Sequence, residues 1–416
     1  MKKQKLLIVG ITMNAAGSEK SFLSFANCLD FERFEVTLLL AKAEGAFLSL
    51  VPAQIQIVEM GEYAAMFTMD GQNAVHTILN CFVKKNPFIL FEILPYFLKS
   101  KLCPRTAHDT ATRLWCRLMQ HMPAFHGTYD AALAYWGDKT MFYMCDKVHA
   151  KRKIAWLHFD YAHPQRDDKT YLHYFNACDT LVTVSAPIQT ALCDRFPALR
   201  GKCVMMENII NASSILRMAE QGEGYPDTDF CGQRILTIGR IAEQKGYDLA
   251  VEALSLLLRE GRQVRWYILG GTGTQEAKVQ LLKQIDRLHL QDAVVFLPCT
   301  QNPYRYLKEC DIYVQPSRHE GKPIAVEEAK ILEKPILVTN YLSANDQLRG
   351  GTLGKICDIS VQGIYQGIKL LLDHPEQRAA YCAALHKEPK GNADEMNVFY
   401  RMLQTTPQPG IEESAG

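Results

Sequence analysis

The sequence lacks three features that would each point to a broad class of protein: an excess of one charge, paired cysteines and a low-complexity tract. Its 46 Lys and Arg residues are balanced by 45 Asp and Glu residues, for a net charge of +1. No general positive field is therefore available for a nucleic-acid backbone. The 13 cysteines are scattered singly, without a Cys-x-x-Cys pair. This spacing favours free thiols in a reducing compartment, most of them small core residues, over disulfides or a zinc site.

Length and composition describe an ordinary globular protein of more than one domain. The 416 residues are 48% hydrophobic and 22% charged, which allows a sizeable core, and the length predicts two or three domains. The slightly negative mean hydropathy argues against a polytopic membrane protein. The apolar stretch Leu6–Met13 is short and is followed by polar residues without a small-residue cleavage site. We therefore expect a buried first strand rather than a signal peptide, and a cytoplasmic protein.

Short apolar runs without alternation recur along the chain, and amphipathic stretches such as Tyr247–Glu260 and Glu327–Leu332 separate them. Such runs are typical of strands buried on both faces of a parallel sheet, and their alternation with helices predicts an α/β protein. The predicted strands are Leu6–Ile11, Val36–Ala41, Ala131–Trp136, Ile154–Phe159, Leu181–Val184, Val204–Ile210, Ile235–Ile238, Trp266–Leu269, Val294–Leu297, Ile312–Val314 and Pro335–Val338.

The strand pattern restarts at Ile235, after the polar, glycine-bearing segment Ala219–Gly232. This restart predicts two doubly wound domains in tandem rather than one barrel, because the irregular stretch Gly61–Tyr129 would break the even spacing of eight strand–helix units. The predicted division is an N-terminal domain over 1–215, a linker over 216–232, a C-terminal domain over 233–385, and a terminal helix and tail over 386–416 that could cross back to the N-terminal domain.

The most informative segment is Asp311–Asn340, DIYVQPSRHEGKPIAVEEAKILEKPILVTN, which predicts a strand, a loop, a helix and a strand. The loop leaves the carboxyl end of a strand, where open α/β sheets bind ligands. It carries Glu320, and Pro323 suits the first turn of the helix that contains Glu328. These acids could merely complement the helix dipole, but the free N–H groups at the start of that helix also make an anion site.

Two other turns carry chemistry of a related kind. In Ile235–Asp248, ILTIGRIAEQKGYD, Arg240 and Lys245 stand five residues apart between a strand and a helix. A guanidinium fork and an ammonium group placed in this way can converge on a diphosphate. The next strand ends in LGGTG (269–273), a turn whose glycines let the backbone approach a ligand closely. Its spacing does not match the dinucleotide-binding fingerprint.

In combination, GR-x4-KG, LGGTG and S-x2-EGKPIAVEEA resemble the nucleotide-sugar domain of retaining GT-B glycosyltransferases of family GT4. The resemblance covers about 233–373. In the N-terminal half, NAAGSEK (14–20) looks like the family's glycine loop, and IAWLHFDY (154–161) like the strand end whose His faces the donor sugar. VMMENIIN (204–211) is similar to the strand that leads into the linker. The chain departs from the family in having EGKP instead of EGFG and Ala16 before a single loop glycine.

The resemblance implies a role for each matched residue. Arg240 and Lys245 would hold the diphosphate and stabilise the charge that develops on it. Glu328 would bind the ribose hydroxyls, Glu320 would lie beside the donor sugar, and His158 would contact that sugar from the N-terminal domain, although a lone His is as often structural. Backbone groups of the glycine-bearing turns would complete the donor site, and the residues concerned are Gly17, Ser18, Gly270, Gly271, Gly321, Lys322, Pro323 and Ile324.

The same resemblance implies a fold and a reaction. The fold would be GT-B, with two Rossmann-like domains facing each other across a cleft, the donor on the C-terminal side and the acceptor on the N-terminal side. The activity would be transfer of a sugar, with retention, from a nucleotide diphosphate sugar, UDP being favoured, to a glycan or lipid-linked glycan in bacterial-type surface polysaccharide synthesis. Because two cations can take the place of a metal ion, neither a metal nor a cofactor is expected. Two alternatives stay open: a nucleotide-sugar epimerase of the same fold and a catalytically silent nucleotide-sugar-binding protein.

One segment of the N-terminal half points to an additional partner. Between Phe82 and Met122 seven basic residues accompany two acidic ones, and the apolar stretch FILFEILPYFL (88–98) lies among them. That stretch is too short to span a bilayer, which takes about 20 residues. An aromatic, apolar helix flanked by cations is typical of an interfacial helix on an anionic leaflet. We therefore expect peripheral attachment to the inner membrane leaflet and no nucleic-acid partner, with a helix packed on the domain as the alternative.

Overall fold

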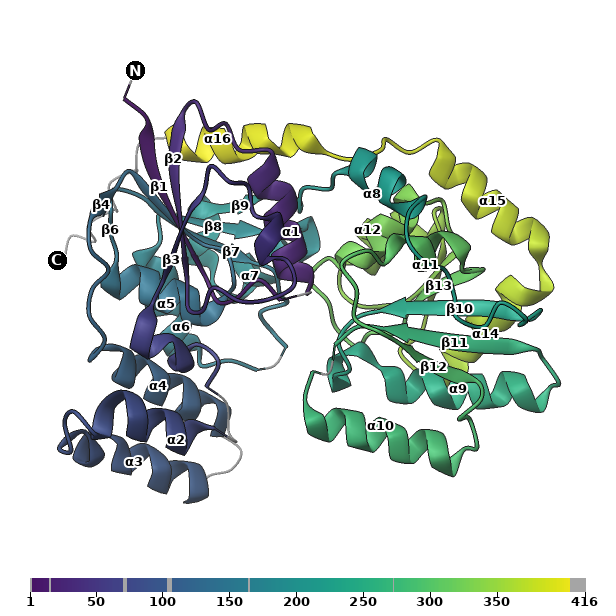
Figure 1. The fold of residues 1–416 in the computed structure, drawn as a ribbon, viewed down its shortest axis with the longest axis horizontal. Coiled ribbons are helices and arrows are strands. Elements are labelled where there is room, and N and C mark those ends of the chain that lie inside the picture. The colour runs from purple at the N-terminus through teal and green to yellow at the C-terminus, as the bar shows by residue number, and fades with distance from the viewer. Residues whose placement is uncertain are drawn as a thin grey trace.

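The computed structural model describes residues 2–14, 16–69, 73–102, 107–163, 165–271 and 273–404. These residues form two α/β domains that lie side by side, each built on a parallel sheet (Figure 1). The prediction of two Rossmann-like, doubly wound domains is confirmed.

The N-terminal domain is built on a seven-stranded sheet in the order β3-β2-β1-β5-β7-β8-β9, with every neighbouring pair parallel. The strand order reverses between β1 and β5, which is where such sheets bind ligands. The strands are β1 Gln4–Gly10, β2 Phe34–Leu40, β3 Gln56–Glu59, β5 Ala131–Ala134, β7 Lys153–Leu157, β8 Thr180–Thr183 and β9 Cys203–Met205. The helices around this sheet include α1 Gly17–Asn27, α5 Asp138–Lys147, α6 Asp168–Ala177 and α7 Ala186–Arg195.

The C-terminal domain repeats this plan on a six-stranded parallel sheet in the order β12-β11-β10-β13-β14-β15, which reverses between β10 and β13. Its strands are β10 Gln233–Ile238, β11 Val264–Leu269, β12 Val294–Leu297, β13 Ile312–Gln315, β14 Ile336–Thr339 and β15 Lys355–Cys357. Its helices include α9 Tyr247–Arg259, α10 Gln275–Arg287, α11 Tyr304–Glu309, α12 Ile324–Ile331, α13 Ala344–Gln347, α14 Val361–Asp373 and α15 Pro375–His386.

Burial on both faces explains why the apolar runs predicted these strands. In β1, Leu7 and Val9 pack into one core layer, while Leu6 and Ile8 pack into the layer on the opposite face. The strands β3 and β15 were not predicted. Both are short strands at a sheet edge whose side chains stay at least partly exposed, so neither needs an apolar run.

Two segments join the domains. Helix α8 (Ala212–Ala219) follows the first crossing and packs through Ile215 against Tyr304 and Ile331 of the C-terminal domain. The expected N-terminal domain extended to residue 215, so the beginning of this helix lies with the other domain instead. After α15 the chain returns to the N-terminal domain as α16 (Met396–Gln404), the yellow helix beside β2 in Figure 1. The α16 side chains in the N-terminal core are Met396, Phe399 and Met402.

The irregular stretch between β3 and β5 forms a helical extension at the far corner of the N-terminal domain (Figure 1). Its helices are α2 Ala74–Ile78, α3 Ile89–Leu102 and α4 Ala107–Met119, with shorter turns of helix at Gly61–Met66 and Leu79–Val83. The segment expected to be one interfacial helix thus contains two helices, α3 and α4, that pack against each other. Among the described residues, none of the helices combines the length and the apolar character needed to cross a membrane.

Candidate functional site

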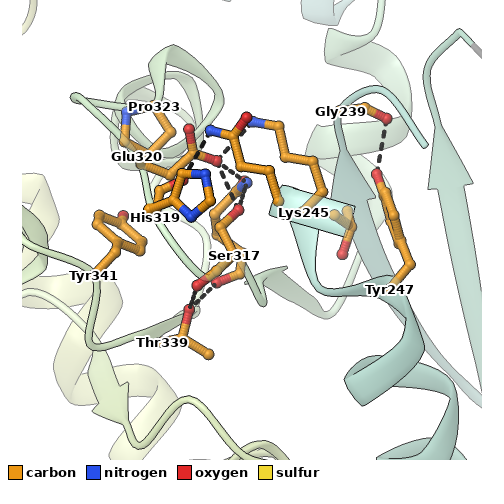
Figure 2. Close-up of polar contacts among 12 residues, drawn as sticks. Gly239, Lys245, Tyr247, Ser317, His319, Glu320, Pro323, Thr339 and Tyr341 are labelled. Carbon is orange, nitrogen blue, oxygen red and sulfur yellow. Dashed lines mark hydrogen bonds and ion pairs between the residues drawn. The ribbon is translucent and has the colours of Figure 1, made fainter. Parts of the chain in front are cut away.

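A buried carboxylate, Glu320, is the centre of a polar cluster in the loop that follows β13 (Figure 2). Its Oε1 atom lies 2.6 Å from Nζ of Lys245. The hydroxyl of Ser317 donates to the same oxygen at 2.6 Å, and the amide of Gln315 donates to it at 3.1 Å. Two residues that stand 75 positions apart in the sequence are thus held as one ion pair at the carboxyl edge of the sheet.

Close backbone packing brings Lys245 to this edge. Gly246 follows it with a φ of 66°, and a Cβ atom at Gly246 would lie 2.0 Å from the carbonyl oxygen of Pro316. Only glycine allows the two turns to approach so closely. Tyr247 then donates to the carbonyl of Gly239 at 2.8 Å, which fastens the start of α9 to the end of β10 (Figure 2).

Arg240 lies on the same edge, but its side chain is exposed rather than part of the Glu320 cluster. Across the interface, Glu19 at the beginning of α1 is buried and accepts a hydrogen bond of 2.6 Å from the hydroxyl of Ser18. Burial raises the pKa of Glu19, while the hydroxyl of Ser18 and the positive charge of Arg240 partly oppose the rise. Arg240 therefore lies close enough to the N-terminal domain for its charge to act on Glu19.

Glu328 lies on α12 with 2% of its side chain exposed. Its Oε1 atom lies 2.5 Å from Nζ of Lys20, which belongs to α1 of the other domain. The hydroxyl of Tyr304 donates to the same oxygen at 3.0 Å, and the Lys20 ammonium lies 4.3 Å from the centre of the Tyr304 ring. Burial and the neighbouring Glu328 carboxylate hold the pKa of Tyr304 well above its ordinary range.

His158 follows β7 and meets the Glu320 loop from the N-terminal side. A Cβ atom at Gly321 would lie 2.3 Å from the carbonyl oxygen of His158, so glycine is required where the two domains touch. Nε2 of His158 is closed off from solvent and makes no hydrogen bond of acceptable geometry among the described residues. Burial lowers the pKa of His158 to about 3, although the Tyr135 backbone and the Asn208 side chain lie close enough to the imidazole to oppose the fall of its pKa. The imidazole is therefore neutral at physiological pH.

The glycines of the predicted donor turns divide into two kinds. At Gly270 a Cβ atom would lie 2.2 Å from the carbonyl oxygen of Gly239, so this glycine permits close packing of the turns after β10 and β11. Around Gly17 and Gly271 nothing lies within 4 Å of such an atom. These two positions therefore leave open space beside the backbone, as a bound ligand would require.

Lys322, Pro323 and Ile324 form the start of α12, with Pro323 at the N-cap position and Ile324 as the first helical residue. The Lys322 side chain does not join the Glu320 cluster. Its Nζ atom lies 2.5 Å from Oε1 of Glu207 at the first domain crossing. Both residues line a cavity of about 410 Å³ at the hinge, together with Asn208, Ile210, Ile324, Glu327, Lys330, Ile331, Asp346, Gln347, Arg349, Glu388, Pro389, Lys390, Gly391 and Asn392.

Sequence reasoning did not identify Glu19, Lys20, Tyr304, Gln315 and Ser317 as site residues. Glu19 and Lys20 stand in the loop motif NAAGSEK, which was a usable signal. Tyr304 stands in the short helix α11, far from any of the motifs, and reaches Glu328 only through the tertiary fold.

The described residues contain no group of three or more His, Cys, Asp or Glu side chains placed to hold a metal ion. The linker does contain an Asp-x-Asp sequence at Asp227 and Asp229, a pattern that could suggest one. Asp227 instead pairs with Arg265 at 2.5 Å and accepts a hydrogen bond from Tyr267. Its carboxylate is thus used within the C-terminal domain itself.

Comparison with known families identifies the C-terminal domain. Residues 232–385 match the family described as glycosyl transferases group 1. The match covers the C-terminal domain and does not extend into the N-terminal one. The matched range holds the Lys245–Glu320 pair and Glu328, so the site residues of the C-terminal half lie in the part of the chain that matches this family.

Curated relatives extend the match in part. An uncharacterized glycosyltransferase of Haemophilus influenzae is 25% identical over 230 residues, 54% of this chain and 61% of the relative. An N-acetylgalactosamine-N,N'-diacetylbacillosaminyl-diphospho-undecaprenol 4-alpha-N-acetylgalactosaminyltransferase of Campylobacter jejuni is 26% identical over 192 residues, 46% of this chain and 50% of the relative. The chain thus spans about half to three fifths of the length of these two relatives.

Solved structures share the whole architecture. Anabaena HepE, in complex with UDP and glucose, superimposes with a TM-score of 0.67 at 15% identity, covering 97% of this chain and 100% of HepE. TarM superimposes with a TM-score of 0.66 at 10% identity, covering 97% of this chain and 99% of TarM. At these identities the likeness concerns the fold, which is the two-domain GT-B arrangement expected from the sequence.

Proposed function

We propose that the protein is a retaining glycosyltransferase that moves a sugar from a UDP-sugar to a glycan or lipid-linked glycan acceptor. The observation that carries the proposal is the Lys245–Glu320 ion pair, buried at the carboxyl edge of the sheet in the domain that matches the family. HepE in complex with UDP supports the choice of nucleotide. The Campylobacter relative, whose name describes a diphospho-undecaprenol acceptor, supports a lipid-linked one.

In the proposed reaction, the bond between the anomeric carbon and the diphosphate oxygen breaks, and the acceptor hydroxyl oxygen forms the new bond to that carbon. The acceptor proton passes to the departing diphosphate. Lys245 and Arg240 would stabilise the charge that collects on the diphosphate, without the help of a metal ion. Neutral His158, whose Nε2 lacks a partner within the described chain, would hydrogen-bond a hydroxyl of the donor sugar.

Glu328→Gln is expected to weaken UDP binding about 10- to 100-fold. The amide removes a charged acceptor for the ribose hydroxyls, and a hydrogen bond to a charged group is worth about 1.5–3 kcal/mol. Calorimetric titration with UDP and a panel of nucleotide sugars measures the effect. Glu327→Gln is the matched control, because this neighbour on α12 pairs with Lys330 and Gln347 instead. Equal affinity of Glu328→Gln and the wild type would remove Glu328 from the site.

The same panel separates the two alternatives from the proposal. A glycosyltransferase releases UDP in proportion to the acceptor that it modifies. An epimerase would convert the sugar of the donor without any acceptor. A silent binding protein would bind the donor without releasing nucleotide.

We propose further that the helical extension places the acceptor side on an anionic membrane. Helix α3 buries Ile93 but leaves apolar side chains exposed: Phe91 and Leu102 in the helix are 75% and 78% exposed, and Phe88 just before it is 74% exposed. An exposed apolar patch of this kind is typical of a surface that contacts a membrane or another protein. Lys84, an exposed residue four positions before Phe88, fits an anionic leaflet.

The structure shows that several of the basic residues expected to attract an anionic membrane are already paired with acidic residues. Lys85 pairs with Glu62, Arg113 with Asp167 at 2.6 Å, and Arg117 with Glu92 at 2.6 Å. Arg105 lies outside the described residues. Because these three cations are already paired with acids, apolar insertion rather than charge should supply most of the attachment.

Phe88→Asp combined with Phe91→Asp is expected to weaken binding to anionic vesicles at least about 100-fold, because each Phe that enters the leaflet contributes about 2 kcal/mol. Sedimentation with phosphatidylglycerol vesicles at low salt measures the bound fraction. Val279→Asp, at a 40% exposed position on α10 of the other domain, is the control. A wild-type protein that ignores such vesicles would show that the α3 face does not bind membranes.

A further inference from the structure

We propose that Lys20 occupies the nucleotide-binding carboxylate of the empty enzyme and must be displaced when the donor binds. The inference rests on the proposed function, because it assumes that Glu328 receives the ribose. It adds a residue that no sequence motif assigned, together with a means by which the donor site controls the relation between the two domains.

We call the ion pair between Lys20 and Glu328 the latch, because it joins the two domains. Lys20 extends from α1 of the N-terminal domain, and its ammonium lies 2.5 Å from Oε1 of Glu328 on α12 of the C-terminal domain. The hydroxyl of Tyr304 donates to the same oxygen at 3.0 Å, and the ring of Tyr304 lies beneath the ammonium at 4.3 Å. The carboxylate is 2% exposed and the lysine side chain 19% exposed, so the pair is sheltered from water and weakly screened.

Competition for Glu328 follows from this geometry. A ribose hydroxyl that donates to Oε1 of the carboxylate competes with Lys20 and Tyr304, which both use that oxygen. Tyr304 belongs to the same domain as Glu328 and can remain, whereas Lys20 arrives from the opposite domain. The ammonium is therefore the group that must leave, and the nucleotide binds at a carboxylate that is fully available only after the latch opens.

Release of Lys20 would also affect the residues at the start of α1, on the N-terminal side of the site. The residues before it, Gly17, Ser18 and Glu19, begin α1 and face the domain boundary, where Glu19 is near Arg240. A donor that frees Lys20 thus also frees the start of α1 from α12. The loop before α1, which the acceptor would contact, would then take up its final arrangement only after the donor has bound. This favours an ordered reaction in which the donor binds first.

The test is a titration of Lys20→Met with UDP. We assume that the latch is closed in about 70–90% of the protein molecules without nucleotide. Its removal should then lower the apparent Kd about three- to tenfold, since the apparent Kd is the intrinsic Kd divided by the fraction of molecules that can bind. Lys20→Arg keeps the positive charge and should fall short of this gain. Lys42→Met, which removes an exposed lysine paired with Glu44 in the same domain, is the matched control.

Hydrogen exchange supplies a second measurement, and a merely structural role of Lys20 would not explain the result expected from it. Without nucleotide, Lys20→Met should exchange faster than the wild type at the start of α1 and in α12, and UDP should raise wild-type exchange at the start of α1 toward that of the variant. Weaker or unchanged UDP binding by Lys20→Met overturns the latch alone. A wild-type protein that binds no nucleotide overturns the proposed function and the latch with it.

Discussion

Lys245→Ala is expected to lower the turnover number for sugar transfer about 100- to 1,000-fold, with a smaller loss of donor affinity. The charge on the departing diphosphate grows toward the transition state, so a fixed cation stabilises the transition state more than the bound donor. In this protein the ammonium is held in place by Glu320, which Ser317 and Gln315 orient in turn. Steady-state kinetics with direct donor titration separates the two effects.

The controls for Lys245 follow from the surroundings of the other cations. Arg240→Ala should act in the same direction but less strongly, because the exposed Arg240 side chain is not held by the Glu320 cluster. Arg259→Ala, at the exposed far end of α9, should leave turnover unchanged. A loss of donor affinity as large as the loss of turnover would argue that Lys245 only binds. Activity that EDTA abolishes and Mg²⁺ restores would show that a metal, rather than these cations, carries the charge.

The stability of the wild-type protein is expected to fall as the pH is lowered from about 6.5 toward 3, and His158→Gln should remove part of that fall. Burial lowers the pKa of His158 to about 3, against about 6.5 in the unfolded chain. The unfolded state therefore binds a proton over this range and the folded state does not, so folding loses free energy as the pH falls. The contribution of His158 reaches about 5 kcal/mol at its limit.

Urea unfolding at a series of pH values measures this difference between His158→Gln and the wild type. His126→Gln, at an exposed position of the same domain, should leave the pH profile unchanged. Parallel pH profiles for the wild type and His158→Gln would show that groups other than His158 account for the protons that the unfolded state binds in excess of the folded state. Added UDP-sugar tests the proposed contact, because a sugar hydroxyl that gives the buried Nε2 a hydrogen-bond partner should stabilise the wild type more than the variant.

Local patterns were sufficient for most of the fold. A strand buried on both faces must be apolar throughout, so β1, β10 and the other central strands could be recognised as runs in the sequence. The start of α12 at Ile324 could likewise be placed from Pro323. The edge strand β3 could not, because most of its side chains remain exposed and no apolar run marks it.

The motifs determined which residue types meet at the carboxyl edges, and the matched family confirms the domain that they indicated. Arg240, Lys245 and Glu320 lie in turns that follow parallel strands, and Glu328 lies in the helix after one of these turns. Parallel strands place such turns at one edge of the sheet. Sequence spacing alone therefore supported their grouping.

Only the tertiary structure decided which charges are paired. Lys322 and Lys20 both lie in motif segments, yet Lys322 pairs with Glu207 at the hinge whereas Lys20 pairs with Glu328 across the domain boundary. Side-chain direction depends on how two domains pack, and the patterns within either domain carry no information about that packing. The physical reason is that an ion pair between domains depends on distances between chain segments more than a hundred residues apart, whereas strand and helix patterns reflect burial within a few residues.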